Sequence, residues 1–419
     1  MRFIRGALGG AIAICAAALL VVSMAPAGPT ALASPDDPPP DGGAAAAGAP
    51  SVGDMASSVI PSTFQSGISS LRQLAHTETV IPPAYNVYAN TMDGYIDPRL
   101  AAIQPRVYVP NSAANTVDVI DPATMKVVDH FSVGSIPHHI TPSWDLKHLY
   151  VEDEGSSLLT VIDPATARVT GTISVPFPYN LYFTPDGSKA IVVVERLARL
   201  DFRDPVSWKL IKSVPIPWRG IDHLDFSADG NYLVGSTEWS GILVKVDTRT
   251  MEVTGSLNVG GLPIDVRLAP DGKVFYVTNQ GTRFVPGVGN TSGVSIVDGA
   301  MMKEIAFLPT PRGAHGLQVS RDTHFMYVSD RDAGAISVID LQLRKIVATW
   351  NVGGSPDMFQ LSPDGSQLWT SGRYNGSVIV VDTDSGHVTK VVRAGAGAHG
   401  LTYFPNAGRY STGHNGVYR

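Results

Sequence analysis

The chain has 419 residues, with 31 basic and 37 acidic side chains, a formal net charge of −6 at pH 7 and one cysteine. A modestly acidic chain without a basic tract argues against general nucleic-acid binding, because that activity needs positive charge to neutralise phosphates. After the N-terminal apolar run, no further run is long enough to span a bilayer, so a membrane protein with several spans is excluded.

Residues 1–33 have the pattern of a signal peptide. Arg2 and Arg5 precede an apolar run from residue 6 to about residue 25, and small residues surround a cleavage position after Ala33. An uncleaved membrane anchor is the competing interpretation, because a run of about 20 residues can span a bilayer. The single cysteine, Cys15, lies in this segment, so the mature chain is expected to lack disulfides, cysteine metal ligands and a cysteine nucleophile.

Two further segments precede the main domain. Residues 34–57 are rich in Pro, Ala, Gly and Asp, a composition that predicts a disordered linker. Residues 58–105 show no clear period, and we expect them to form an N-terminal extension that packs on the domain of residues 106–419. The signal-peptide pattern of residues 1–33 predicts that the protein is secreted or otherwise extracytoplasmic.

Residues 325–365 are the clearest copy of a unit that recurs in this domain. Residues 326–328 and 336–339 are short β-branched and aromatic runs, residues 345–351 alternate apolar with polar, and residues 359–361 form a last apolar run. Glycine and proline turns separate the later runs, so the unit predicts four short strands. One such sheet cannot bury both of its faces, so neighbouring copies must pack on one another.

Seven copies can be counted, because one strand of each copy ends in an aspartate. These residues are Asp121, Asp163, Asp201, Asp247, Asp298, Asp340 and Asp382. Seven units at this period predict an all-β fold, a seven-bladed β-propeller of four-stranded antiparallel blades. A solenoid is the weaker alternative, because it would need capping repeats at both ends. The aspartates themselves are expected to begin turns by accepting hydrogen bonds from backbone N–H groups.

A four-residue motif marks one strand of the repeats. Residues 276–279 read YVTN, and residues 108–111, 150–153 and 327–330 are variants of this motif. In these features the chain resembles the YVTN-repeat β-propeller family of exported bacterial proteins, over roughly residues 106–414. The resemblance implies an extracytoplasmic seven-bladed propeller, distantly similar to the haem d1 propeller of cytochrome cd1 nitrite reductase. The family has no single activity, so the resemblance implies a fold and not a function.

The strand order predicts how the ring closes. The first repeat begins at Arg106 with a second strand, and the last repeat ends with an inner strand at residues 399–404. The last inner strand should therefore join the strands of residues 106–133 in one blade, which removes open sheet edges. Residues 409–414 resemble a surplus second strand that competes with residues 106–111, and the sequence leaves this choice open.

Alignment of the inner strands brings two positions into register at one mouth of the central channel. The first position holds His138, Tyr179, Asp222, Ile264, His315, Asp357 and His399. The second holds His139, Asn180, His223, Asp265, Gly316, Met358 and Gly400. Glu238 and His414 are expected nearby, and Arg267 should line the channel further along its strand. This rim should be a funnel of imidazoles and carboxylates.

These side chains suggest candidate ligands, because imidazole and carboxylate together suit Zn, Cu, Fe or Ni. The candidate metal ligands are His138, His139, His223, His315 and His399. The candidate residues for an organic ligand are Asp222, Asp265, Asp357, Arg267 and Tyr179. The competing interpretation is structural, because the wet mouth of a propeller collects polar side chains that bond neighbouring blades. Seven-fold spacing also places opposite blades far apart for one small ion.

Residues 280–290 form an insertion in the fifth repeat, between its second and third strands. The insertion could be a lid over the histidine rim. We favour a tolerated surface insertion, because loops accept extra residues more readily than strands do.

Two function classes remain. The first, which we favour, is an exported, non-enzymatic scaffold that binds a protein, a glycan or a small ligand on the rim. The second is an oxidoreductase that uses a transition metal or a tetrapyrrole held there, or a metal-dependent lactonase or hydrolase. In that class the carboxylates would orient the histidines or act as general bases. We expect a monomer that contacts a membrane only through an uncleaved N-terminal segment.

Overall fold

The computed structural model describes residues 86–414 and 418–419. The predicted signal peptide, the predicted linker and residues 58–85 of the predicted extension lie outside this part of the chain. In the part that is described, no helix has the length and apolar character needed to cross a membrane.

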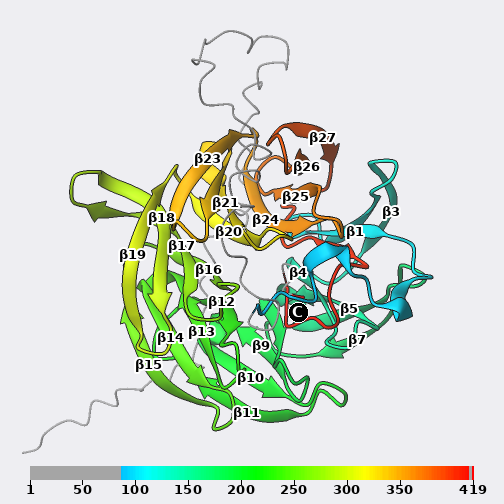
Figure 1. Cartoon of the computed structure of the whole chain (residues 1–419). Coiled ribbons are helices and arrows are strands. Elements are labelled where there is room, and N and C mark those ends of the chain that lie inside the picture. The colour runs from blue at the N-terminus through cyan, green and yellow to red at the C-terminus, as the bar shows by residue number, and fades with distance from the viewer. Residues whose placement is uncertain (1–85, 415–417) are drawn as a thin grey trace, which may run out of the picture. The chain divides into compact units, whose positions relative to one another are not determined.

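Seven four-stranded antiparallel sheets form the blades of a ring, which confirms the predicted fold (Figure 1). Blade 1 contains, from the innermost strand outward, β28 (Thr402–Phe404), β1 (Arg106–Asn111), β2 (Thr116–Asp121) and β3 (Lys126–Ser132). Blade 2 contains β4 (Pro137–Pro142), β5 (Leu149–Asp153), β6 (Leu158–Asp163) and β7 (Arg168–Ser174). Blade 3 contains β8 (Asn180–Phe183), β9 (Ala190–Val194), β10 (Arg199–Arg203) and β11 (Leu210–Pro215).

The other four blades repeat this order. Blade 4 contains β12 (Ile221–Phe226), β13 (Tyr232–Thr237), β14 (Ile242–Asp247) and β15 (Glu252–Asn258). Blade 5 contains β16 (Pro263–Leu268), β17 (Phe275–Val285), β18 (Gly289–Asp298) and β19 (Lys303–Thr310). Blade 6 contains β20 (Ala314–Val319), β21 (Phe325–Asp330), β22 (Ala335–Asp340) and β23 (Lys345–Asn351). Blade 7 contains β24 (Pro356–Leu361), β25 (Gln367–Gly372), β26 (Ser377–Asp382) and β27 (Val388–Arg393).

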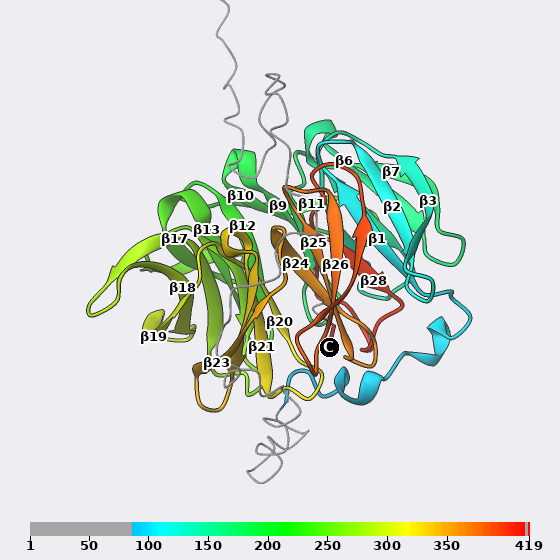
Figure 2. The ribbon, with the colours of Figure 1, turned by 90° about the horizontal axis from the view of Figure 1, so that it is seen from above.

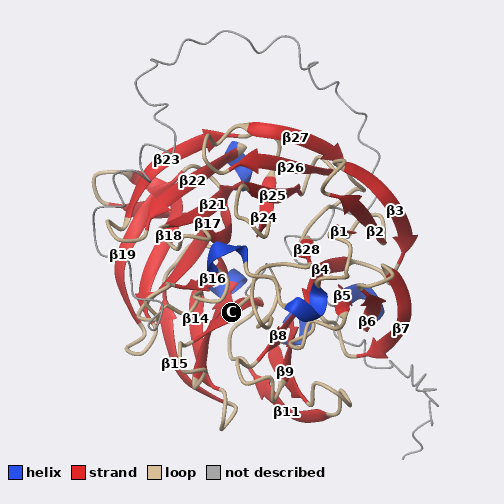
Figure 3. Cartoon of the chain, turned by 45° about the vertical axis from the view of Figure 1, so that its right-hand side comes forward, coloured by secondary structure: helices blue, strands red, loops and turns tan. Residues whose placement is uncertain are grey.

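Helical structure is limited to short 3₁₀ turns in the described residues, as Figure 3 shows in blue. Two precede blade 1, namely η2 (Met92–Gly94) and η3 (Pro98–Leu100). Four follow second strands, namely η4 (Glu154–Ser156), η5 (Glu195–Leu197), η6 (Glu238–Ser240) and η7 (Arg331–Ala333). The latter four connect second strands to third strands at the same end of the ring.

The ring closes through the last inner strand, as the sequence predicted. β28 pairs with β1, from Arg106 opposite Phe404 to Tyr108 opposite Thr402. β28 also contacts β24 of the preceding blade and β4 of the following one. Residues 409–414 do not add a second strand to blade 1. Instead, Ser411 pairs with Tyr418, which settles the choice that the sequence left open.

The apolar cores lie between neighbouring blades. One cluster joins side chains of blade 3, such as Phe202, to side chains of blade 4, such as Phe226. Another joins Tyr327 of blade 6 to Phe359 of blade 7. Inner strands are buried along their whole length, whereas outermost strands such as β7 are largely exposed. A single blade therefore depends on its neighbours for burial of its apolar faces.

The aspartates that end the third strands mostly form the predicted turns. Asp121 accepts a hydrogen bond from the N–H of Ala123 at 2.9 Å, and Asp382 accepts one from Ser385 at 2.8 Å. Asp201 does not end its strand as predicted, because β10 continues to Arg203, and Asp201 is buried and pairs with Arg203 at 3.1 Å. Short side-chain acceptors at these positions fix the turn that leads to the outermost strand.

The insertion of residues 280–290 extends β17 and β18 into a projecting hairpin (Figure 1). Arg283 binds the hairpin to the outer part of blade 5, because it lies 3.0 Å from Glu304 and stacks over Phe307 of β19. The exposed fractions of Phe284 and Val288 are 72% and 58%. The hairpin thus leans on the outermost strand of its own blade, which agrees with a surface insertion better than with a lid.

The first described residues and the segment after β28 meet at one end of the ring (Figure 2). Gly408 donates its N–H to the carbonyl of Tyr95 at 2.9 Å. The N–H of Val87 is bonded to the carbonyl of Pro270, in the turn that follows β16. This end is opposite to the mouth at which the inner strands begin.

Candidate metal centre

A recurring β-bulge positions the histidines. Between β4 and β5, Pro137 stands opposite Asp153 and Ile140 stands opposite Val151, so His138 and His139 both oppose one residue. The same register shift occurs at the start of β12, β16, β20 and β24. A bulge bends the strand and re-aims its side chains. The bulges in β4 and β12 lie where His139 of blade 2 and His223 of blade 4 approach each other.

Three histidines have the spacing of metal ligands. One ring nitrogen from each of His139, His223 and His414 lies within 4.8 Å of the other two. Their ring centroids are 5.3 Å apart for the first two, 4.2 Å for His139 and His414, and 4.6 Å for His223 and His414. All three residues are buried, with at most 1% of their surface exposed. Three imidazole nitrogens are a common donor set for one transition-metal ion.

His139 lies at the centre of this group and against Gly400. Within residues 86–414 and 418–419, no group hydrogen-bonds either ring nitrogen of His139. The inner strands of blades 1 and 2 run parallel here, and Gly400 donates its N–H to the carbonyl of His138 at 3.0 Å. A Cβ atom on Gly400 would overlap the ring of His139. Glycine at this position therefore leaves the space that the imidazole occupies.

His223 is oriented by a carboxylate of its own strand. Its Nδ1 atom lies 2.7 Å from Oδ1 of Asp222, and both side chains are completely buried. A carboxylate this close to one ring nitrogen can orient the imidazole of a metal ligand. Asp222, predicted as a residue for an organic ligand, thus lies behind one of the three histidines.

His414 comes from the segment after β28 rather than from a blade. Its Nδ1 atom lies 3.4 Å from the hydroxyl of Tyr182. Its Nε2 atom has no hydrogen-bond partner in the part of the chain that is described. Backbone pairing of Gly413 with Tyr182 holds this residue in place. The sequence placed His414 near the rim but did not identify it as a candidate ligand.

The electrostatics around His139 and His414 favour neutral imidazoles. Burial lowers the pKa of His139 well below its ordinary value, and the neighbouring imidazoles, chiefly those of His414 and His399, lower it further. Burial also lowers the pKa of His414 well below its ordinary value, and His223 and Arg267 add to this effect. A neutral imidazole has the lone pair that a metal ion requires.

His138 borders this group of three histidines, and its ring lies beside a carboxylate. Its Nε2 atom lies 3.2 Å from Oε2 of Glu154, in the turn that follows β5. Arg196 binds the same carboxylate, with Nε 2.9 Å from Oε1. His138 therefore belongs to a buried ion-pair network at the rim.

His315 and His399 share Asp357. The Nδ1 atom of His399 lies 2.5 Å from Oδ2 of Asp357, and that of His315 lies 3.0 Å from Oδ1. Arg331 binds the same carboxylate through Nε at 2.9 Å and also contacts His315. Burial opposes ionisation of Asp357, but Arg331 and the two histidines together hold its pKa below the ordinary value. The ring of His399 also lies 4.6 Å from that of His139, so it borders the group of three.

The remaining predicted residues connect inner strands. Asp265 accepts a hydrogen bond from the N–H of Leu317 in the next blade at 2.8 Å. Arg267 lies 3.5 Å from Asp265 and donates to the carbonyl of Leu317 at 3.2 Å. The ring of Tyr179 packs 4.7 Å from that of His138. Asp265 and Arg267 therefore hydrogen-bond the backbone of the neighbouring inner strand.

A second set of rim residues includes Glu238, which the sequence placed near the rim, but alignment of the inner strands did not identify Glu154, Arg331 and Arg373. The first residue after a second strand is charged and buried in five blades, with 0–4% of its surface exposed. These residues are Glu154, Glu195, Glu238, Arg331 and Arg373. Acidic residues occupy this place in blades 2 to 4 and arginines in blades 6 and 7. The signal was present in the repeats, because all five follow the YVTN-type strand directly.

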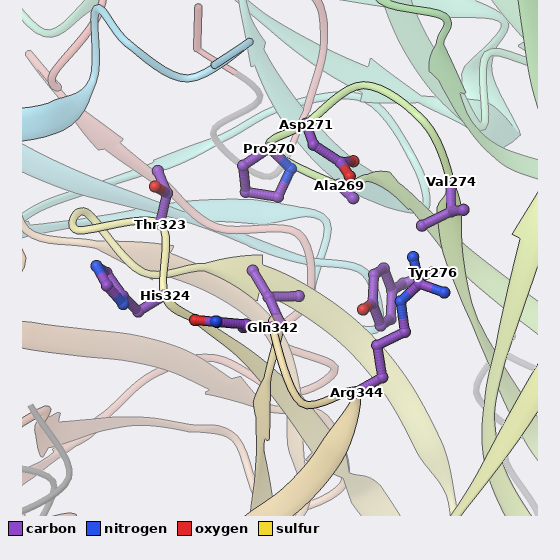
Figure 4. Close-up of a pocket in the computed structure, with 10 residues that line it drawn as sticks. Ala269, Pro270, Asp271, Val274, Tyr276, Thr323, His324, Gln342 and Arg344 are labelled. Carbon is purple, nitrogen blue, oxygen red and sulfur yellow. The ribbon is translucent and has the colours of Figure 1, made fainter. Parts of the chain in front are cut away.

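A cavity of about 480 Å³ lies away from the histidines, between the turns of blades 5 and 6. In Figure 4, Arg344 lies beside Tyr276 at one side, and Thr323 and His324 line the other side. Asp271 and Pro270, in the turn after β16, complete the wall. None of the three clustered histidines lines this cavity.

The comparison with protein families decides the classification. The model of the YNCE-like beta-propeller matches residues 80–409. The chain belongs to this family. A curated relative of this YNCE-like propeller, antigen Lp49 of Leptospira interrogans serogroup Icterohaemorrhagiae serovar copenhageni (strain Fiocruz L1-130), is 26% identical over 189 residues. The match covers 42% of this chain and 41% of the relative, so the chain spans about two fifths of the length of Lp49.

Solved structures resemble this YNCE-like propeller in fold. Kuenenia stuttgartiensis hydrazine synthase matches with a TM-score of 0.57 and 22% identity, over 66% of this chain and 92% of that chain. Dihydro-heme d1 dehydrogenase NirN, in complex with DHE, matches with a TM-score of 0.55 and 16% identity, over 72% and 75% of the two chains. The second likeness agrees with the predicted distant similarity to a haem d1 propeller. Identities this low show the fold alone.

Proposed function

We propose that this YNCE-like propeller is an exported protein that binds one transition-metal ion through His139, His223 and His414. The observation that carries the proposal is the convergence of three buried imidazoles, with ring nitrogens within 4.8 Å of one another. Two of the three, His139 and His414, have a pKa lowered well below the ordinary value, so they are neutral at physiological pH.

A purely structural role explains this group poorly. Buried polar atoms in native proteins nearly always have a hydrogen-bond partner, and each exception calls for an explanation. Both ring nitrogens of His139 lack one in the described part of the chain. A bound cation would supply the partner of one nitrogen, and it would offset the cost of burying the ring among other imidazoles.

The donor set indicates the kind of ion. Imidazole nitrogens suit Zn²⁺, Cu²⁺, Ni²⁺ and Fe²⁺, and affinities for such sites are generally highest for Cu²⁺. We therefore propose Cu²⁺ or Zn²⁺. An ion fits better than a tetrapyrrole, because ring centroids 4.2–5.3 Å apart leave no room for a macrocycle between the three histidines.

The surroundings favour binding over catalysis. A catalytic metal keeps a coordination position that substrate can reach, whereas closed sites hold the ion for binding or for structure. The three candidate ligands are buried, and the nearest other histidine, His399, is bonded to Asp357. Asp222 would orient His223 from behind. Export is supported by the signal-peptide pattern of residues 1–33.

The test is a calorimetric titration of the protein purified after export and stripped with a chelator. We expect one Cu²⁺ or Zn²⁺ per chain for the wild type. His139→Ala combined with His223→Ala should abolish that binding while the circular dichroism spectrum keeps its β form. His139→Gln serves as a second variant that preserves more of the packing.

The control is His387→Ala, which removes an exposed histidine that is not part of the cluster. This variant should bind the ion as the wild type does. Equal loss of binding in the control and in the cluster variant would point to a surface histidine, and unchanged binding in the cluster variant would reject the proposed centre.

A further inference from the structure

The segment after β28 is tied to the ring at several points on both sides of His414. The N–H of Phe183 in β8 is bonded to the carbonyl of Thr412 at 2.9 Å. Gly413 pairs with Tyr182 of the same strand. Earlier in the segment, Asn406 donates from Nδ2 to the carbonyl of Leu361 in β24 at 2.9 Å. The segment thus connects blade 7 to blade 3 across the channel.

The last residue of the sequence anchors this segment. The guanidinium of Arg419 lies 2.7 Å from Oδ1 of Asp225 in β12, and both side chains are buried. The other oxygen of Asp225 accepts the N–H of Leu268 from blade 5 at 2.8 Å. Arg419 also exchanges backbone hydrogen bonds with the segment, at 2.9 Å to Arg409 and 3.1 Å to Tyr410. The pairing of Ser411 with Tyr418 encloses His414 between these contacts.

His414 differs from the other two proposed ligands in one respect that matters for binding. His139 and His223 belong to β4 and β12, which are fixed by the blades, whereas His414 belongs to a segment that forms no blade strand. An ion shared by the three residues would therefore connect this segment to blades 2 and 4. Its affinity would depend on how well the segment is held, because tethering sets the effective concentration of the third ligand.

We propose that residues 405–414, held by Arg419, act as a metal-locked strap, in which the ion and the contact between Arg419 and Asp225 stabilise each other's binding. The inference rests on the proposed metal centre and adds its regulation. Coupling between two sites is reciprocal: metal binding holds the strap against the channel, and release of the anchor weakens the metal site by the same factor. Without the ion, Nε2 of His414 stays buried without a hydrogen bond in the described region, which favours departure of the strap.

The experiment combines hydrogen exchange with calorimetry on the full exported protein. Amides of residues 406–414 should exchange at least about fivefold more slowly with saturating Zn²⁺ than after chelation, the lower end of the range typical for coupled sites. Arg419→Ala should weaken Zn²⁺ binding at least about fivefold and leave the stoichiometry at one ion per chain. Asp225→Asn is the second variant, with the same expected direction.

The matched control is Arg409→Ala, which removes an exposed arginine from the same segment and leaves the contact with Asp225. This variant should bind Zn²⁺ with wild-type affinity. Full Zn²⁺ binding by the wild type, with unchanged exchange of the strap and unchanged affinity in Arg419→Ala, would overturn the strap and leave the metal centre standing. Failure of the wild type to bind any ion would overturn both.

Discussion

Gly400 and His139 illustrate how one residue sets the site. The inner strands of blades 1 and 2 approach closely enough that a Cβ atom on Gly400 would overlap the His139 ring. The approach is fixed by backbone hydrogen bonds on both sides, such as that from Ile140 to the carbonyl of Gly400 at 3.1 Å. The ring cannot retreat easily, because three other imidazoles surround it.

Gly400→Ala should therefore lower stability and displace His139. We expect a loss of about 1–3 kcal/mol in the free energy of unfolding, typical of overpacking in a core. Zn²⁺ affinity should fall as well, which calorimetry and urea unfolding can measure together. The control is Gly171→Ala in β7, where a Cβ atom meets nothing within 4 Å. Equal effects of the two substitutions would contradict the proposed packing.

Asp330 provides a test of pH dependence at the rim. Burial raises the pKa of Asp330 to about 7, although hydrogen bonds such as that from Ser337 at 2.7 Å favour the ionised form. Because the pKa is higher in the folded state than in the unfolded state, the contribution to stability is full below about pH 4 and is lost as the pH rises towards 7. Blade 5 has Asn279 at this place, bonded to Ser295 at 2.9 Å, so an amide fits.

Asp330→Asn should remove this dependence. The free energy of unfolding of the variant minus that of the wild type should increase by about 1.4 kcal/mol per pH unit between pH 5 and about 7, and then level off. Urea unfolding of both proteins at pH 5, 6, 7 and 8 measures this difference. A difference that stays constant from pH 5 to 7 would show that this carboxyl ionises alike in the folded and unfolded states.

At the level of the strand, β28 closes the ring with three residues. Its pairing with β1 supplies the inner strand of blade 1, and its neighbours on either side are inner strands of blades 7 and 2. Without it, blade 1 would expose the edge of β1 and one apolar face. Closure therefore links the first described blade strands to the last.

Removal of residues 397–419 should abolish cooperative unfolding. The expected urea curve, followed by circular dichroism, is broad and without a single sharp transition. The control replaces residues 284–290 by Asn-Gly, which joins the paired residues Arg283 and Thr291 through a two-residue turn. This shortened hairpin should unfold as sharply as the wild type. A sharp transition in the truncated protein would show that the ring does not need its last strand.

Across the whole chain, the sequence predicted the fold because seven copies of one pattern each indicate the same four-stranded blade. Seven regularly spaced aspartates set the number of blades, and six of them, such as Asp121 and Asp382, end a third strand in the structure. The position of the closing strand followed from the strand order at Arg106. The fate of residues 409–414 could not be predicted, because their pairing with Tyr418 and Tyr182 lies outside any repeat.

The candidate centre was predictable in part, because alignment of the repeats brings two of its histidines into register. His139 and His223 were found because they occupy one aligned position of the inner strands. His414 escaped because it is contributed by the segment after the last blade, and its approach to the other two depends on tertiary contacts such as that between Arg419 and Asp225. Spacing alone also could not show that His138 and His399 face carboxylates, since Glu154 and Asp357 come from other turns and blades.

The most direct test of the central claim is X-ray absorption spectroscopy of the protein loaded with one equivalent of Zn²⁺ or Cu²⁺. The proposed centre predicts three imidazole nitrogens at about 2.0 Å from the ion, and two in the His414→Ala variant. A first shell made of oxygen alone, or a spectrum that does not change in that variant, would contradict the assignment of the ion to the group of His139, His223 and His414.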